Sequence, residues 1–155
     1  MEERKEASTP MATSTYLDLD EKAKLVNESK YRGMISSLLY LNVSQPNIML
    51  NVCLCGRYQP NPKEYQLTIV KRIIKCLKGT SNVGLWYPKG TSLSIIGVLD
   101  SDFVGCKLDR KSTNGTCHLL GSSLISWNCK KKACVELSTA EAKYIAARSC
   151  CTQSL

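Results

Sequence analysis

The chain has 155 residues, of which 43% are hydrophobic and 22% charged, a length and composition that suit one ordinary soluble domain or two incomplete ones. No stretch approaches the ~20 apolar residues of a membrane-spanning helix. The charged first ten residues also lack the apolar segment of a signal peptide. We therefore expect an intracellular protein that is not secreted and has no membrane partner, with its compartment in the cell left open.

The cysteine content also favours an intracellular protein. The chain has nine cysteines and one histidine. An odd number without a regular framework argues against a disulfide scaffold and favours a reducing compartment. The spacing of the cysteines and of His118 does not match a zinc site, so we expect mostly buried free thiols.

Positive charge is concentrated in the larger part of the chain. The formal net charge is +8 overall, and residues 31–155, with 16 basic and 6 acidic side chains, carry +10. Such a surface favours a polyanionic partner such as nucleic acid. A solvated basic surface without any partner is the alternative reading.

The first half of the chain predicts helices. Residues 1–28 have little apolar periodicity and are expected to be a loose lead-in. Apolar residues at helical spacing then predict three short helices within residues 31–79. For the third helix, Asn61 is the expected N-cap and Pro62 the first helical residue. Its predicted apolar stripe consists of Leu67, Val70, Ile73, Ile74 and Leu77.

After Gly79 the pattern changes to that of strands. Four are predicted, at residues 83–87, 93–100, 116–120 and 124–127, and the short connections between the last three favour an antiparallel meander. Trp86 and Trp127 are interpreted as core residues. Ser138, followed by Glu141, then predicts a capped helix. The fold class is therefore α+β or α/β, with N-terminal helices followed by a meander and one helix.

Three acids have the spacing of a divalent-metal site. Asp100 closes a predicted strand, Asp102 is two residues further along the same face, and Glu141 opens the following helix. Carboxylates converging in this way suit Mg²⁺ or Mn²⁺, which prefer oxygen ligands. The alternative is that these acids are ordinary turn formers and caps.

Several motifs, in order, resemble one known family. They are residues 31–41 and 44–48, residues 70–80, the run Gly-Val-Leu-Asp-Ser-Asp-Phe-Val-Gly at 97–105, and residues 109–115, 125–127 and 137–142. Together these segments resemble the Pol polyproteins of copia-type retrotransposons. The resemblance covers nearly all of residues 31–155, and it corresponds to the tail of the reverse transcriptase followed by the start of the ribonuclease H domain.

This resemblance implies a domain order and a reaction. Residues 29–80 would be the helical reverse transcriptase tail, and residues 81–155 a truncated ribonuclease H-like fold. That domain cuts the RNA strand of an RNA–DNA hybrid with two divalent metals held by four carboxylates. Asp100 matches the first-strand carboxylate, and Glu141 lies in the motif that supplies the helix carboxylate.

Two departures from the family weaken the expected site. The family motif Glu-Ala-Glu-Tyr has become Glu141-Ala142-Lys143-Tyr144, and the motif alone leaves open whether position 141 or 143 binds metal. Residues two apart on a helix point ~200° apart, so both cannot face one site. The third and fourth carboxylates are expected beyond Leu155. We therefore expect weak or absent metal binding in this chain.

Basic side chains on two segments are candidates for nucleic-acid contact. Lys71, Lys75 and Lys78 project from the third predicted helix and could meet backbone phosphates. Lys130 and Lys131, with Lys132 after them, follow the last predicted strand, where a solvated lysine turn is the favoured reading.

Three functional hypotheses follow from these features. In the first, the chain is a polyprotein fragment with inherited RNA–DNA hybrid hydrolysis, inactive or nearly so by itself, whose partners are the hybrid and the rest of the polyprotein. In the second, it is a basic nucleic-acid-binding module without catalysis. In the third, it is the non-functional remnant of a decayed element.

Overall fold

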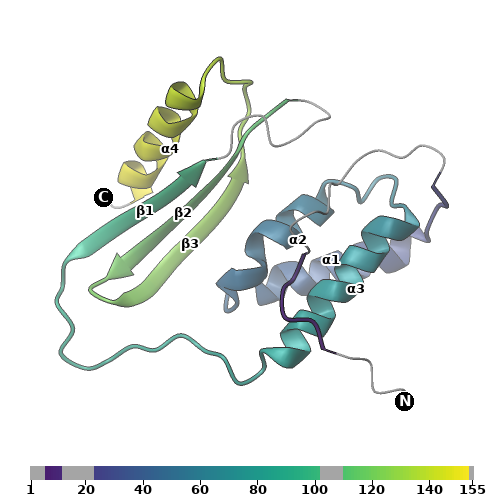
Figure 1. Cartoon of the computed structure of the whole chain (residues 1–155), viewed down its shortest axis with the longest axis horizontal. Helices are drawn as coiled ribbons and strands as arrows, with labels where there is room; N and C mark the ends of the chain where they lie inside the picture. The colour runs from purple at the N-terminus through teal and green to yellow at the C-terminus, as the bar shows by residue number, and fades with distance from the viewer. Residues whose placement is uncertain (1–5, 12–22, 102–109, 154–155) are drawn as a thin grey trace. The chain divides into compact units, whose positions relative to one another are not determined.

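The computed structural model describes residues 6–11, 23–101 and 110–153. The chain separates into two compact units, residues 1–84 and residues 85–155. The first unit is helical and the second combines a sheet with one helix (Figure 1). The α+β class expected from the sequence is therefore confirmed. None of the described helices has the length and apolar content needed to cross a membrane.

Three α-helices and one 3-10 turn form the first unit, as the apolar spacing predicted. In chain order they are α1 (Glu28–Leu41), the 3-10 helix η1 (Pro46–Ile48), α2 (Met49–Gly56) and α3 (Glu64–Gly79). The side chain of Asn27 caps α1 by accepting a hydrogen bond from the Lys30 N–H at 2.9 Å. Pro46 stands at the start of η1, where its fixed φ and missing N–H are tolerated.

The start of α3 lies further along the chain than predicted. The helix begins at Glu64, and the cap residue is Lys63, which has an extended backbone. The reason is tertiary, because the segment 24–26 pairs with residues 62–64. Val26 donates to the Pro62 carbonyl and Glu64 to the Lys24 carbonyl, both at 3.0 Å. The Lys63 N–H is satisfied at 2.8 Å by Gln66 Oε1. The prediction of Asn61 as N-cap was therefore wrong.

The core of the helical unit gathers one face from each helix. It consists of Tyr31, Ile35, Leu38, Ile48, Val52, Cys55, Ile69, Val70 and Ile73. The buried face of α3 is shifted from the predicted stripe: Gln66, Ile69 and Cys76 are buried, whereas Ile74 is 43% exposed. Inside this core, the Tyr31 hydroxyl donates a 2.9 Å hydrogen bond to the Cys55 carbonyl.

Part of the N-terminal segment contacts these helices. Arg72 of α3 donates from Nε to the Thr9 carbonyl at 3.1 Å and from Nη2 to Thr9 Oγ1 at 3.0 Å. Met11 packs against the core. The segment 6–11 is thus attached to α3, although its composition gave no sign of this.

The second unit contains a three-stranded antiparallel meander, as predicted. Its strands are β1 (Ile95–Ser101), β2 (Thr113–Leu120) and β3 (Ser123–Lys131), in the order β1-β2-β3. The register pairs Leu99 with Thr116 and Thr116 with Asn128, and an irregularity follows His118. The two-residue turn between β2 and β3 uses Gly121, which has φ of 59°, a conformation that favours glycine.

The strand predicted at residues 83–87 is absent from the structure, which has no regular element between α3 and β1. A strand needs a backbone partner, and what links this segment to β3 is a side chain: the Tyr87 hydroxyl donates to the Leu124 carbonyl at 2.8 Å. Trp86 is 81% exposed, so its interpretation as a core residue was wrong. Trp127, on β3, is half-buried.

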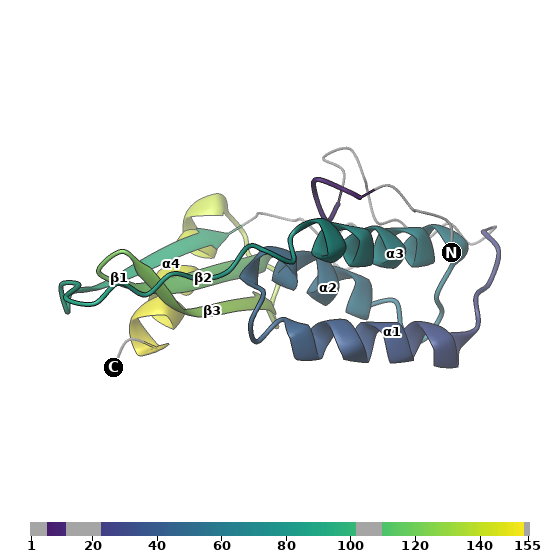
Figure 2. The same cartoon turned by 90° about the horizontal axis from the view of Figure 1, so that it is seen from below.

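Helix α4 (Thr139–Gln153) packs along one face of the sheet, against β1 and β2 (Figures 1 and 2). Its start agrees with the predicted Ser138 cap, because Ser138 Oγ accepts a 3.1 Å hydrogen bond from the Glu141 N–H. Ala142, Ala146 and Cys150, spaced four apart, form the buried face of the helix. Small side chains here let α4 approach the sheet closely.

Candidate functional site

Asp100 lies on the sheet face away from α4. Thr116 faces the helix, since its hydroxyl donates to Gln153 Oε1 at 3.3 Å. Leu99 is paired with Thr116 and therefore shares that face. Side chains alternate along a strand, so Asp100 points to the opposite side, where it is exposed together with Ile96 and Val98. Asp102, its predicted neighbour, lies outside the described residues.

The carboxylate of Glu141 is engaged at the helix start. Its Oε2 accepts a 2.7 Å hydrogen bond from the Leu137 N–H, one residue before the Ser138 cap. This contact resembles a capping box shifted by one residue, and it satisfies a backbone donor that would otherwise be unpaired. The capping alternative raised by the sequence thus accounts for at least one contact of this acid.

Lys143 lies on the side of α4 that faces β1. Lys143 precedes Cys150 by seven residues, so the two side chains are only about 20° apart around the helix. Cys150 lies close to β1, because a Cβ added to Gly97 would be 2.7 Å from the Cys150 Sγ. Glu141 instead lies one turn before Ile145, on another side of the helix. Ile145 lines a pocket between α4, β2 and β3 that is described below. Of the two positions that the family motif left open, 143 is therefore nearer to the strand that carries Asp100.

These placements do not assemble a divalent-metal site within the described residues. Asp100 and α4 are on opposite faces of the sheet, Glu141 caps its own helix, and a lysine occupies position 143. No group of three or more potential metal-binding side chains from His, Cys, Asp and Glu occurs in the part of the chain that the structure describes. As arranged, these residues do not fit a pair of Mg²⁺ or Mn²⁺ ions.

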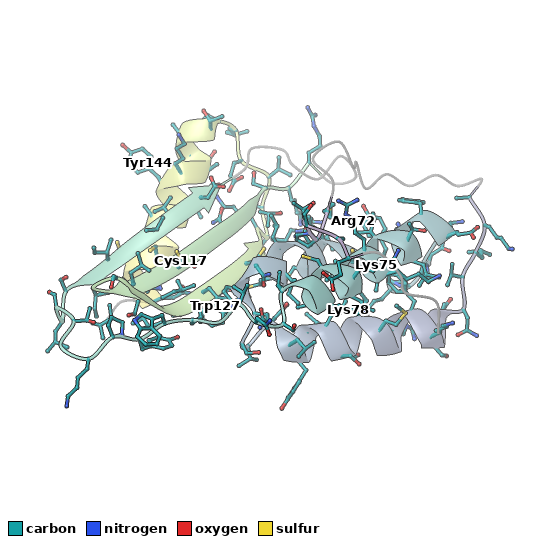
Figure 3. All side chains as sticks on the ribbon, turned by 60° about the horizontal axis from the view of Figure 1, so that its bottom comes forward. Arg72, Lys75, Lys78, Cys117, Trp127 and Tyr144 are labelled. Atoms are coloured by element: carbon teal, nitrogen blue, oxygen red, sulfur yellow. The ribbon has the colours of Figure 1, made fainter. Side chains whose placement is uncertain are left out.

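The lysines of α3 follow one exposed side of that helix. Lys71, Lys75 and Lys78 are separated by four and three residues, the spacing that places side chains on one face. Lys71 and Lys78 are exposed and Lys75 is half-buried. Lys75 and Lys78 are labelled along α3 in Figure 3, together with Arg72, which is held by Thr9. The three lysines form a short cationic stripe.

The lysines at 130–132 do not form a solvated turn, so the reading favoured from the sequence was wrong. Lys130 and Lys131 belong to β3, opposite Asn114 and Thr113. The Lys132 side chain is 7% exposed and forms an ion pair with Glu136, whose side chain is 1% exposed. Lys132 Nζ also donates to the Ala142 carbonyl at 2.6 Å. This pair ties the end of β3 to the start of α4.

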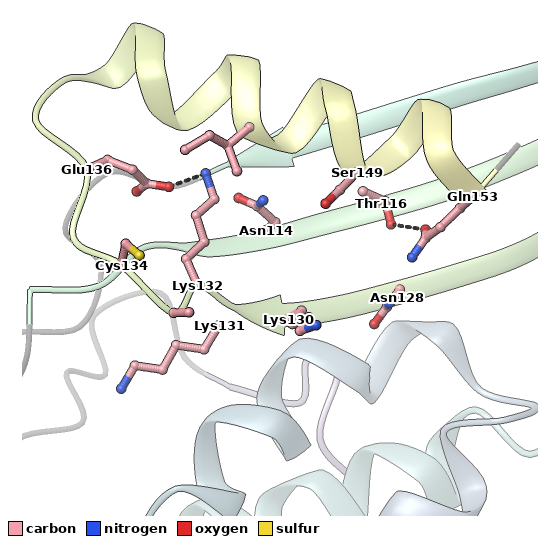
Figure 4. Close-up of a pocket in the computed structure, with 12 residues that line it drawn as sticks. Asn114, Thr116, Asn128, Lys130, Lys131, Lys132, Cys134, Glu136, Ser149 and Gln153 are labelled. Carbon is pink, nitrogen blue, oxygen red and sulfur yellow. Dashed lines mark hydrogen bonds and ion pairs between the residues drawn. The ribbon is translucent and has the colours of Figure 1, made fainter.

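A polar pocket lies between α4, β2 and β3 and was not foreseen from the sequence. Its volume is about 280 Å³. Figure 4 shows the lysine–glutamate pair at one end and the Thr116–Gln153 hydrogen bond at the other. The signal was present in β2, where Asn114, Thr116 and His118 alternate on the face that α4 covers, a position where apolar residues are usual. The remaining polar residues lining the pocket are Asn128, Lys130, Lys131 and Ser149.

The contact between α4 and β2 contains a buried histidine–cysteine pair. His118 Nε2 lies 3.2 Å from the Cys150 carbonyl and 3.6 Å from its Sγ. Both residues are more than nine-tenths buried. Burial, with smaller effects from Cys151 and Cys117, raises the pKa of the Cys150 thiol, which favours its protonated form. No disulfide joins the cysteines among the described residues.

Comparison with known proteins identifies relatives over most of the chain. It is 40% identical over 140 residues to the retrovirus-related Pol polyprotein from transposon RE1 of Arabidopsis thaliana, a match that covers 90% of this chain and 10% of the polyprotein. It is 33% identical over 155 residues to the corresponding polyprotein from transposon TNT 1-94 of Nicotiana tabacum, covering 95% and 12%.

A shorter relative exists as well. The uncharacterized mitochondrial protein AtMg00810 of Arabidopsis thaliana is 33% identical over 138 residues, which cover 87% of this chain and 58% of that protein. By contrast, the chain spans about a tenth of the length of the RE1 and TNT 1-94 polyproteins. No protein-family profile matches it, and no solved structure is significantly similar to it.

Proposed function

The chain is related to the Pol polyproteins of copia-type transposons, and from this premise we propose that residues 81–155 are the front of a ribonuclease H-like domain. The inherited reaction is metal-assisted hydrolysis of RNA in an RNA–DNA hybrid. The observation that carries the proposal is the element order, in which a strand with Asp100 opens an antiparallel meander that is followed directly by α4. Residues 29–80 are proposed to be the reverse transcriptase tail.

The reaction would need Mg²⁺ or Mn²⁺, because two hard cations can stabilise both the attacking and the leaving oxygen of a phosphodiester. Asp100 is the best-supported ligand, with Glu141 and Asp102 as weaker ones. Asp100 and Glu141 do not come together among the described residues, and Lys143 adds a positive charge on the β1 side of α4. We therefore propose that the chain alone, an intracellular polyprotein segment, binds metal weakly and cuts poorly or not at all.

The test is a cleavage assay with a labelled RNA–DNA hybrid in Mg²⁺ and, separately, Mn²⁺. Wild-type chain is expected to give no cutting above background. Robust cutting that Asp100→Asn abolishes would overturn the proposed inactivity while supporting the ancestry. Lys143→Glu is the matched variant, because it removes the cation from the helix side next to β1. Increased Mn²⁺ affinity in Lys143→Glu, absent in Lys89→Glu, would support position 143 as the ligand position.

The cationic stripe on α3 favours a second candidate, nucleic-acid binding without catalysis. Each lysine that meets a phosphate releases counterions, so affinity should fall steeply with salt. Replacing Lys71, Lys75 or Lys78 with alanine is expected to lower the salt slope by about one each, whereas Asp100→Asn should leave affinity unchanged. Absence of measurable affinity for hybrid and duplex at low salt would eliminate this candidate.

A further inference from the structure

Segment 6–11 lies along one face of α3 and contacts it at several points. Arg72 donates from Nε to the Thr9 carbonyl at 3.1 Å and from Nη2 to Thr9 Oγ1 at 3.0 Å. Glu6 lies beside Gly79, because a Cβ added to that glycine would be 3.3 Å from the Glu6 Cβ and Oε2. Gly79 follows Arg72 by seven residues, so the two positions are only about 20° apart around the helix. The segment therefore follows a single line on the surface of α3, and its last residue packs against the core.

The Thr9 hydroxyl is surrounded by cationic side chains. Thr9 is exposed and Arg72 is half-buried, and in the described parts of the chain no acid forms an ion pair with this arginine. A guanidinium has five N–H donors, and the two bonds to Thr9 leave the others for a further acceptor. Lys75 follows Arg72 by three residues, the spacing of neighbouring side chains on a helix, and Figure 3 labels both on the same stretch of α3. A group with several negative oxygens on Thr9 would therefore meet both cations.

The sequence also marks this hydroxyl as an acceptor for phosphate. Thr9 is followed by Pro10, and it is the only serine or threonine in the chain that precedes a proline. This dipeptide is the motif that proline-directed protein kinases modify. The two hydrogen bonds that hold Thr9 are exposed, so opening the segment to such a kinase costs little free energy. The chain thus offers the kinase one acceptor at an accessible position.

We propose that Thr9 is a phosphorylation site and that Arg72, with Lys75 beside it, binds the phosphate. In the transfer, Thr9 Oγ1 forms a bond to the γ-phosphorus of ATP, the bond from that phosphorus to the bridging oxygen breaks, and ADP leaves. The hydroxyl proton passes to a base of the kinase. The product carries about −1.5 to −2 charges at pH 7 and three strong acceptor oxygens, which the planar guanidinium can bind through two parallel N–H bonds. Phosphorylation therefore fastens segment 6–11 to α3.

The same phosphate would change the cationic stripe on α3. Lys75 is the middle lysine of that stripe, so a phosphate beside it offsets part of the positive charge. Weaker attraction of polyanions follows, and this consequence rests on the nucleic-acid binding proposed above. The phosphate site itself needs neither nucleic acid nor the carboxylates assigned to hydrolysis. Its test contains no nucleic acid, so it can fail without affecting the proposed function, and the reverse also holds.

The test is phosphorylation of the full chain by a purified proline-directed serine/threonine kinase with ATP and Mg²⁺. Mass spectrometry is expected to find phosphate on Thr9 and none in Thr9→Val. The modified chain is then freed of Mg²⁺ and its phosphate is titrated by ³¹P NMR. Pairing with a cation favours the doubly charged phosphate, so its second pKa, about 6 when unpaired, should fall by about half a unit or more. The same phosphorylated chain unfolded in urea is the unpaired reference.

Charge variants identify the side chains that bind the phosphate. Arg72→Gln is expected to remain a substrate of the kinase but to have a phosphate pKa close to that in urea. Lys75→Gln should remove a smaller part of the shift, and Arg148→Gln, in the other unit, should leave it unchanged. If Arg72→Gln does not fold, the comparison of folded and unfolded wild type still decides. Absence of phosphate on Thr9, equal phosphate pKa values in the folded and unfolded chain, or an unchanged shift in folded Arg72→Gln would overturn the proposal.

Discussion

Removing Lys132 should strongly destabilise the second unit. Its side chain is 7% exposed, pairs with Glu136 at 1% exposure, and donates to the Ala142 carbonyl at 2.6 Å. Lys132→Met retains the apolar stem but leaves the Glu136 carboxylate buried without its counter-ion. Breaking a buried pair by removing one partner costs on the order of 3–5 kcal/mol. At about 0.05–0.15 kcal/mol per residue, the total stability of residues 85–155 would be roughly 4–11 kcal/mol.

The measurement is urea unfolding followed by tryptophan fluorescence. Both tryptophans, Trp86 and Trp127, lie within residues 85–155, so the signal reports on this unit alone. Lys132→Met should shift the midpoint to much lower urea, or unfold the unit in buffer. The double variant Lys132→Met/Glu136→Leu should recover most of the loss, because no buried charge remains. A single-variant loss below about 1 kcal/mol would match an exposed pair and refute the reasoning.

Three further predictions concern packing and pH. Gly97→Ala should destabilise the second unit by about 1–3 kcal/mol, because the added Cβ would lie 2.7 Å from Cys150 Sγ. The double variant Gly97→Ala/Cys150→Ala should regain the lost stability. If Gly97→Ala has no effect on unfolding followed by fluorescence, the close approach of α4 to β1 is contradicted. Tyr31→Phe should lower the free energy of unfolding of the helical unit by about 1 kcal/mol, because the 2.9 Å hydrogen bond to the Cys55 carbonyl is lost. Unfolding followed by circular dichroism measures this change. Alkaline pH should destabilise the same unit: burial raises the pKa of the Cys55 thiol from 9.0 to about 12, and burial followed by Cys55 raises that of Tyr31. The folded unit therefore favours the protonated forms of both groups. Their contribution to the free energy of unfolding is fully present below pH 9 and is lost as the pH rises towards 12. The double variant Cys55→Ala/Tyr31→Phe should lose much less stability over this pH range.

The sequence by itself determined most elements and their order. Apolar spacing specified the helices between residues 28 and 79, and β-forming residues with a short turn specified the meander. Ser138 marked the start of α4, and its hydroxyl does cap the Glu141 N–H. These features depend on contacts within a few residues or on a single periodicity, which local sequence encodes directly. The relation to Pol polyproteins could likewise be read from ordered motifs.

Local sequence could not determine what pairs across the chain. Helix α3 begins at Glu64 rather than Pro62 because residues 24–26 hold Lys63 extended. The segment 83–87 has strand-like composition, yet a strand forms only where a neighbouring backbone completes its hydrogen bonds. Lys132 reads as a solvated surface residue until Glu136 and the Ala142 carbonyl are brought beside it.

The candidate site shows the same division most clearly. Sequence identified Asp100 and Glu141 as acids at a strand end and a helix start, and it left positions 141 and 143 open. Only the tertiary structure determined that α4 covers the face of Leu99 and Thr116, which leaves Asp100 on the other side and Lys143 towards β1. Strand alternation is a local property, but the face that a helix covers is chosen by packing between distant segments.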